Sequence, residues 1–205
     1  MARFTGLKTL TALVLAALLT AACTQKQSDD MAADDEEADS AEAQNVEIGQ
    51  AIVEGWGCVY CHTPEVKGPD GLGMPDPDRL MSGHPGDQPI PPVPDAPIDS
   101  VEWTDYLEQL GSTAWPSDDS IVFSSNLTPD PETGIGEWTA EEFVETIRQG
   151  MQRAMGRQIK YPMPWEELSE LSDIELASIY EYLMTLQPVP NEVPEPVAIG
   201  ADNNQ

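Results

Sequence analysis

Apolar residues recur at helical spacing in three segments, and each begins with a polar residue typical of a helix start. The first follows Asn45, which we expect to cap a helix ending near residue 56. The other two begin with capping boxes, Thr-x-x-Glu at 139–142 and Ser-x-x-Glu at 172–175, and Pro188 ends the last. No run of alternating polar and apolar residues competes, so the pattern predicts a mostly helical fold with long loops.

A long Pro-rich stretch, residues 64–120, separates the first helical segment from the other two. Its residues 89–94 favour extended polyproline structure, and a short helix is predicted from Asp99 to Leu110. Loops of this length are uncommon in a compact domain unless they are functional. The stretch either shapes a surface for a partner or only shields the core beneath it, and the sequence leaves both readings open.

Residues 1–22 have the pattern of an export signal, with basic residues ahead of an apolar stretch from Thr9 to Leu19 that is too short to span a bilayer. A cut after the small residues that follow exposes Cys23, as in bacterial lipoproteins. We therefore expect a lipid anchor at Cys23 in the periplasm or cell envelope, with an ordinary secretory cut as the alternative. Residues 23–44 are acidic and almost free of large apolar side chains, which predicts a disordered tether.

The charge balance is strongly acidic, with 37 Asp and Glu against 9 Lys and Arg and a formal net charge of −28. Nucleic-acid binding needs a basic surface, and so does docking on anionic lipid through cations, so both are excluded. Such a surface either steers a basic partner at low ionic strength or reflects adaptation to salt. The sequence does not separate these two explanations.

The pentapeptide Cys58-Val59-Tyr60-Cys61-His62 directly follows the first helical segment. C-x-x-C-H is the attachment pattern of a c-type haem, in which two thiols one turn apart bond the porphyrin and the adjacent histidine reaches the iron. A dithiol redox site is disfavoured because no βαβ pattern follows, and a zinc site because only Cys23 and His84 remain as further cysteine or histidine ligands. A disulfide within the motif would close too small a loop to stabilise much.

Four ordered motifs carry a family resemblance: GCVYCHT at 57–63, NLTPDPETGIGEWT at 126–139, YPMPW at 161–165, and a final helix ending LMTLQPVPN. With them, residues 45–190 resemble bacterial monohaem class I cytochromes c, close to the membrane-associated cytochrome subunits of periplasmic dehydrogenases. The resemblance implies a mostly α class I cytochrome c fold around one covalent haem c. It also implies that the first and last helices cross, with Gly49 allowing close approach near Tyr180. Residues 191–205 are expected to form a disordered tail.

Met163 is the expected second axial ligand of the haem iron, opposite His62. A thioether is a soft ligand that suits haem iron, and prolines on both sides stiffen the loop. The family places its methionine ligand in the same loop. Three other methionines lie in or beside predicted helices and are less favoured as ligands: Met151, Met155 and Met184. Two more, Met74 and Met81, lie in the Pro-rich stretch and stay open as ligands. His84 would instead give a bis-histidine haem.

An iron with both axial positions filled has no place for a substrate. The sequence therefore predicts an exported electron carrier that passes single electrons between redox protein partners, such as a membrane dehydrogenase or a terminal oxidase, and is not itself an enzyme. Two alternatives stay open. The chain is a dedicated subunit of a dehydrogenase complex, or it is a five-coordinate haem enzyme or gas sensor in which Met163 does not bind the iron.

Overall fold

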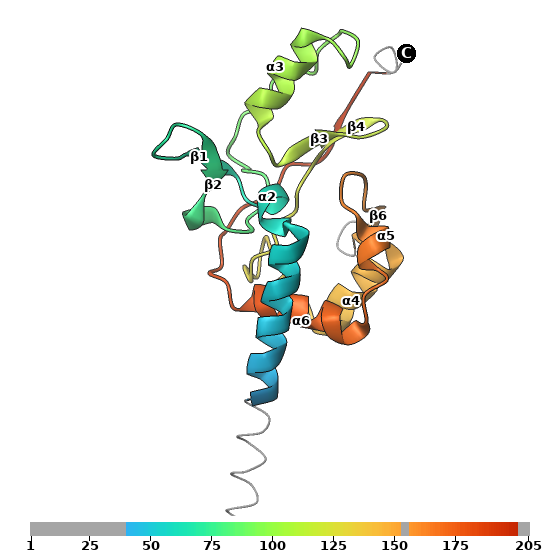
Figure 1. Ribbon diagram of the computed structural model, residues 1–205. Helices are drawn as coiled ribbons and strands as arrows, with labels where there is room; N and C mark the ends of the chain where they lie inside the picture. Colours follow the sequence, from blue (N-terminus) through green and yellow to red (C-terminus); the bar gives the residue numbers. More distant parts are fainter. Residues whose placement is uncertain (1–39, 153–155, 201–205) are drawn as a thin grey trace, which may run out of the picture. The chain divides into compact units, whose positions relative to one another are not determined.

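The computed structural model describes residues 40–152 and 156–200 (Figure 1). The predicted signal peptide, Cys23 and most of the acidic tether lie outside these residues. The chain divides into two units, residues 1–44 and 45–205, and the fold below is that of the second. No helix in the described part of the chain combines the length and the apolar character needed to cross a membrane.

Helices dominate the fold, as predicted. Residues 40–56 are helical and are followed by α2 (Cys58–His62), α3 (Val101–Leu110), α4 (Ala140–Gln149), α5 (Trp165–Leu168) and α6 (Asp173–Met184) (Figure 1). A single 3-10 turn, η1, spans Pro77–Arg79. The expected N-cap at Asn45 is wrong, because residues 40–44 are already helical. These residues include alanine, glutamate and glutamine, which are strong helix formers and extend the helix toward the N-terminus.

Both predicted capping boxes are present. The Thr139 side chain accepts a hydrogen bond from the backbone N–H of Glu142, and the Glu142 carboxylate accepts one from the backbone N–H of Thr139. Ser172 and Glu175 make the same reciprocal pair at the start of α6. Helices α4 and α6 therefore begin where the sequence predicts, because their first N–H groups are satisfied locally.

Short strands accompany the helices, which the sequence did not predict. Strands β1 (Glu65–Lys67) and β2 (Gly73–Pro75) form an antiparallel hairpin, as do β5 (Met151–Gln152) and β6 (Arg157–Gln158). A three-stranded antiparallel sheet has the order β3 (Ala114–Pro116), β4 (Ser120–Phe123) and β7 (Val197–Ala198). Strands of two to four residues are too short for an alternating pattern to stand out in the sequence.

The C-terminal segment is ordered over residues 191–200, where the sequence predicted part of a disordered tail spanning 191–205. Strand β7 pairs with β4, and Asn191 is buried. The side-chain amide of Asn191 donates to the carbonyl oxygens of Ser82 (2.7 Å) and His84 (2.8 Å) and accepts from the N–H of Gly86 (2.8 Å). The prediction is thus wrong for residues 191–200, because these partners lie between 76 and 109 residues earlier and leave no local pattern.

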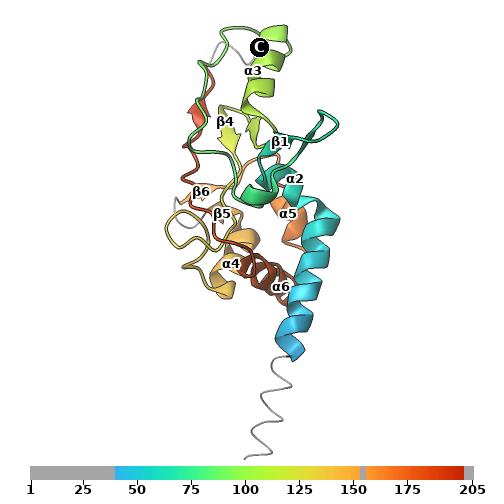
Figure 2. The same cartoon turned by 90° about the vertical axis from the view of Figure 1, so that its left-hand side faces the viewer.

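Two separate groups of buried side chains form the core. The larger joins the first helix to α4 and α6 and consists of Val53, Met81, Ile135, Phe143, Ile147, Leu168, Leu176, Ile179 and Leu183. The smaller is centred on α3, where Trp103, Tyr106 and Leu110 pack with side chains of β3 and β4. Figure 2 shows α3 and β4 in the same part of the molecule. Helix α3 itself confirms the short helix predicted from Asp99 to Leu110. The Pro-rich stretch thus contributes most of a small second core, which residues of β4 and of the C-terminal segment complete.

The first helix and α6 cross at Gly49. A Cβ atom at this position would lie 1.8 Å from the carbonyl oxygen of Ser178, so the two backbones touch. The close approach implied by the family resemblance is therefore present, at Ser178 and not at Tyr180. Tyr180 instead donates a hydrogen bond to the carbonyl oxygen of Trp138 at 2.5 Å, which ties α6 to the loop before α4.

Candidate functional site

The C-x-x-C-H pentapeptide forms helix α2, set off from the preceding helix by Gly57. Gly57 has a left-handed backbone (φ 70°), a conformation that glycine adopts without steric cost. Cys58 is half-buried, Cys61 is exposed, and neither thiol is in a disulfide. Burial raises the pKa of both thiols. Because the two cysteines are three residues apart in a helix, they lie on neighbouring positions of one face.

His62 is buried and held in one orientation. Its Nδ1 lies 2.9 Å from the carbonyl oxygen of Ser125, an atom that only accepts hydrogen bonds, so Nδ1 carries the proton and Nε2 keeps its lone pair. Burial lowers the pKa of His62 and favours the neutral ring. A histidine fixed in this way has the tautomer and orientation of a metal ligand. The part played by Ser125 could not be read from the sequence, because every residue has a backbone carbonyl.

An apolar cavity opens beside α2 and brings together three of the predicted site residues: Cys58, His62 and Met163. Its volume is about 40 Å³. Apart from His62, all the lining side chains are apolar or contain sulfur. They come from the first helix, from α4 to α6 and from the intervening loops, and include Ile52, Val53, Phe143, Ile147, Leu176 and Leu183. The apolar walls and the single histidine therefore suit an apolar group that takes one histidine ligand.

The loop that carries Met163 is fixed at both ends. Met163 donates its N–H to the carbonyl oxygen of Lys160 and accepts a hydrogen bond from the N–H of Trp165 at 2.9 Å. The Trp165 ring packs against Gly150 so closely that a Cβ atom there would lie 2.6 Å from it. This contact anchors the loop to the C-terminal end of α4 and places Met163 at the cavity wall.

Met81 lines the same cavity, and the sequence had left it open as a ligand. It is 2% exposed and is the only described residue other than glycine with a positive φ, at 61°. Its N–H donates to the Thr63 hydroxyl at 3.0 Å, and the carbonyl of the neighbouring His62 accepts from the N–H of Gly83 at 2.8 Å. Met81 is therefore tied to the segment that carries His62.

The remaining candidate ligands lie elsewhere. Met74 and Met151 are exposed on short strands, and Met184 packs at the edge of the core. Met155 lies outside the described residues. In the part of the chain that the structure describes, no three or more histidine, cysteine, aspartate or glutamate side chains form a cluster suited to a metal ion.

His84 is fully buried but does not line the cavity. Its Nδ1 is 2.9 Å from the Thr113 hydroxyl, and its ring centroid is 4.5 Å from that of Phe123. Burial, reinforced by the positive charge of Arg79, lowers the pKa of His84 to about 4. The histidine belongs to the packing of the Pro-rich stretch, so the structure does not support a bis-histidine site.

The described fold and cavity are those of a small, mostly helical protein with a C-x-x-C-H motif at an apolar pocket. No family model matches the chain. It is 40% identical over 63 residues to the cytochrome c subunit of an alcohol dehydrogenase (quinone) from Gluconobacter oxydans. The aligned residues cover 31% of this chain and 13% of that protein. It is 37% identical over 75 residues to the fructose dehydrogenase cytochrome subunit of Gluconobacter japonicus, covering 37% of this chain and 15% of that protein.

A third relative is a nicotinate dehydrogenase subunit from Pseudomonas putida. It is 36% identical over 84 residues, which cover 41% of this chain and 7% of that protein. The chain thus aligns with less than a sixth of the length of each of these three relatives. The predicted resemblance to the cytochrome c subunits of dehydrogenases is confirmed.

Proposed function

We propose that this chain is an exported monohaem cytochrome c that passes single electrons between redox proteins. The observation that carries the proposal is the convergence of Cys58, His62 and Met163 on one apolar cavity. The names of the relatives, cytochrome subunits of dehydrogenases, support it. A haem c bound in this cavity would supply a reversible one-electron couple at its iron.

The residues present fit this group. Cys58 and Cys61 are free thiols on one face of α2 and would hold the porphyrin through two thioether bonds. His62 would bind the iron through Nε2, since Nδ1 is already engaged by Ser125. The chain has one C-x-x-C-H motif, so we propose a single haem. The hydrogen bond from Nδ1 increases the basicity of the ring and favours retention of the ligand.

Met163 is proposed as the second axial ligand in preference to Met81. Met81 is tied through Thr63 to the segment of His62, whereas Met163 enters the cavity from the loop before α5. We therefore propose that Met81 supports the segment that carries His62 and that Met163 is the thioether that would hold the iron.

An iron ligated by His62 and Met163 offers no open position to a substrate. The apolar walls keep water out, and the fixed loops limit rearrangement when the charge of the centre changes. These properties suit an electron carrier and not a catalyst. Its partners would be a dehydrogenase on the donor side and another redox protein or terminal oxidase on the acceptor side.

The absorption spectrum of the haem-loaded protein tests the proposed ligands. The oxidised wild type should show a weak methionine-to-iron band near about 700 nm, and the reduced protein should not bind carbon monoxide rapidly. Met163→Leu should abolish the band and allow carbon monoxide to bind. Met81→Leu is the matched control, since it replaces the other cavity thioether and should keep the band. A high-spin wild-type spectrum with immediate carbon monoxide binding would contradict the carrier and favour a five-coordinate enzyme or sensor.

A further inference from the structure

Exposed apolar side chains gather around the C-x-x-C-H motif. Among the described residues, ten large apolar side chains are exposed, and five of them lie between residues 56 and 74: Trp56, Tyr60, Val66, Leu72 and Met74. Single exposed apolar residues are normal on a protein surface. Half of them fall within one short segment of the chain, and exposed apolar side chains that form a patch are typical of interaction surfaces.

The β1–β2 hairpin presents three of these side chains. It begins three residues after His62, and the N–H of Asp76 donates to the carbonyl oxygen of Pro64 at 2.8 Å to close its base. Val66 and Met74 are direct partners across the two strands and so point to the same face. Leu72 lies at the turn and is 69% exposed. Both cartoon views place the hairpin beside α2 (Figures 1 and 2).

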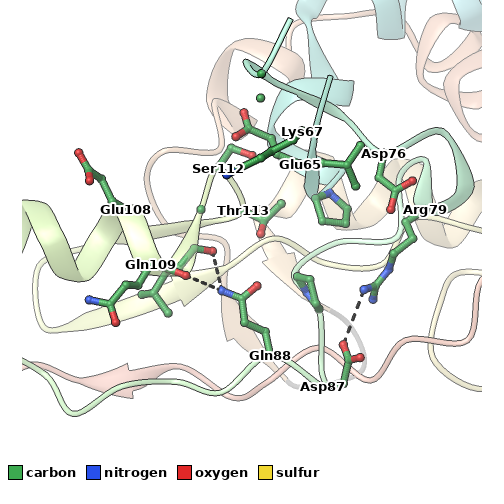
Figure 3. Close-up of a pocket in the computed structure, with 17 residues that line it drawn as sticks. Glu65, Lys67, Asp76, Arg79, Asp87, Gln88, Glu108, Gln109, Ser112 and Thr113 are labelled. Carbon is green, nitrogen blue, oxygen red and sulfur yellow. Dashed lines mark hydrogen bonds and ion pairs between the residues drawn. The ribbon is translucent and has the colours of Figure 1, made fainter. Parts of the chain in front are cut away.

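Beside the hairpin lies a cleft of about 660 Å³ with an excess of negative charge (Figure 3). Its carboxylates come from Glu65 on β1, from Asp76 and Asp87, and from Glu108 on α3. Its two cations are Lys67 and Arg79, and Arg79 is already paired with Asp87 at 3.6 Å. Within the described part of the chain, Glu65, Asp76 and Glu108 form no ion pair, which leaves them to attract external cations.

We infer that the β1–β2 hairpin, together with Trp56 and Tyr60, forms the docking surface for a redox protein that presents an apolar patch rimmed by lysine and arginine. This hairpin surface rests on the proposed function, because Cys61, a proposed attachment site of the haem, is exposed on the helix that precedes the hairpin. The apolar centre supplies contact area, and the carboxylates of the cleft supply the complementary rim. A second copy of this chain, with a net charge of −28, lacks that basic rim.

Electron exchange with mitochondrial cytochrome c, a basic redox protein that serves as the probe, tests the hairpin surface by stopped flow. Leu72→Ser/Met74→Ser should lower the second-order rate constant on the order of tenfold. Ile174→Ser is the control, because Ile174 is also 69% exposed but lies on α6, and its rate should equal the wild type. Equal rates for the two variants would overturn the docking surface.

The charged rim is tested by ionic strength. Glu65→Gln/Glu108→Gln should flatten the dependence of the rate constant on salt, whereas Glu166→Gln/Glu167→Gln on α5 should keep the wild-type slope. If the rate constants of the two variants depended on salt with the same slope, the carboxylates of the cleft would not form the charged rim of the docking surface. A dimer in analytical ultracentrifugation that Leu72→Ser/Met74→Ser dissociates would also overturn the inference, in favour of self-association.

Hexacyanoferrate distinguishes this inference from the proposed function. This small oxidant needs no protein docking surface, so the hairpin variants should react with it at the wild-type rate. No reaction of the wild type with hexacyanoferrate would overturn the electron-carrier proposal itself. Normal reaction with hexacyanoferrate but no effect of the hairpin variants on the rate with cytochrome c would overturn the docking surface alone.

Discussion

At the residue scale, the two buried histidines show how surroundings decide the role of one side chain. His62 and His84 are both buried, and each uses Nδ1 in one hydrogen bond at 2.9 Å. His62 lines the apolar cavity, whereas His84 packs against Phe123, and its Nε2 has no hydrogen-bond partner in the described structure. The first is therefore suited to bind a metal and the second contributes to packing.

Titration of His84 should make stability depend on pH. Its pKa is about 4 in the folded chain and about 6.5 in an unfolded one. Below pH 6.5 the unfolded chain binds this proton before the folded chain does, so the free energy of unfolding falls as the pH drops toward 4. Above pH 6.5 this histidine contributes no pH dependence.

Urea denaturation between pH 7 and 5 measures this effect. Over the full titration, we expect the free energy of unfolding to fall on the order of 2 kcal/mol more in the wild type than in His84→Gln. Part of this difference should appear between pH 7 and 5. Glutamine lacks the titrating group and can still hydrogen-bond Thr113. Parallel pH profiles for the two proteins would show that His84 does not control the acid sensitivity.

At the scale of elements, the crossing of the first helix and α6 depends on one missing side chain. A Cβ atom at Gly49 would collide with the backbone of α6 at Ser178, and backbone atoms cannot rotate away as a flexible side chain can. This crossing helps to form the cavity, since the first helix contributes Ile52 and Val53 to its wall.

Gly49→Ala should therefore destabilise the protein by about 2–4 kcal/mol, since the helices must separate to admit the methyl group. Gly55→Ala is the matched control, because it lies in the same helix with nothing within 4 Å of the added Cβ. That substitution should be neutral or stabilise by up to about 1 kcal/mol. Thermal denaturation of the haem-loaded variants measures both, and equal losses would refute the steric explanation.

At the scale of the whole molecule, the excess of negative charge governs which partners the protein favours. Four cations of the described chain are engaged in ion pairs with carboxylates: Arg79, Arg148, Arg157 and Lys160. Because acidic residues outnumber basic ones by 37 to 9, the chain has too few cations to neutralise most of its carboxylates. Such a surface favours basic partners and keeps copies of the chain apart.

The proposed lipid anchor makes a prediction about the full chain. When the protein is expressed with its export signal, Cys23 should be diacylated and the protein should fractionate with membranes. Mass spectrometry of the mature N-terminal peptide measures the modification. Cys23→Ser should abolish it and release a soluble protein with an unchanged haem spectrum. An unmodified Cys23 in the wild type would instead support the ordinary secretory cut.

What the sequence determined by itself was local. The capping boxes at Thr139 and Ser172, helix α3 and the C-x-x-C-H motif all rest on residues within a few positions of one another. Local chemistry of this kind survives in any tertiary context, and so it could be predicted. The same reasoning failed at Asn45, where upstream helix formers extended the helix past its expected cap.

Only the tertiary structure decided which distant groups meet. The carbonyl of Ser125 orients His62 across 63 residues, Asn191 holds the loop at residues 82–86, and Met81 joins Met163 at one cavity. These contacts rest on backbone groups and on packing, neither of which has a residue-type signature. The sequence thus named the candidate haem ligands, and the fold brought Met81 and Met163 to one cavity, because only the path of the chain decides which distant side chains line the same space.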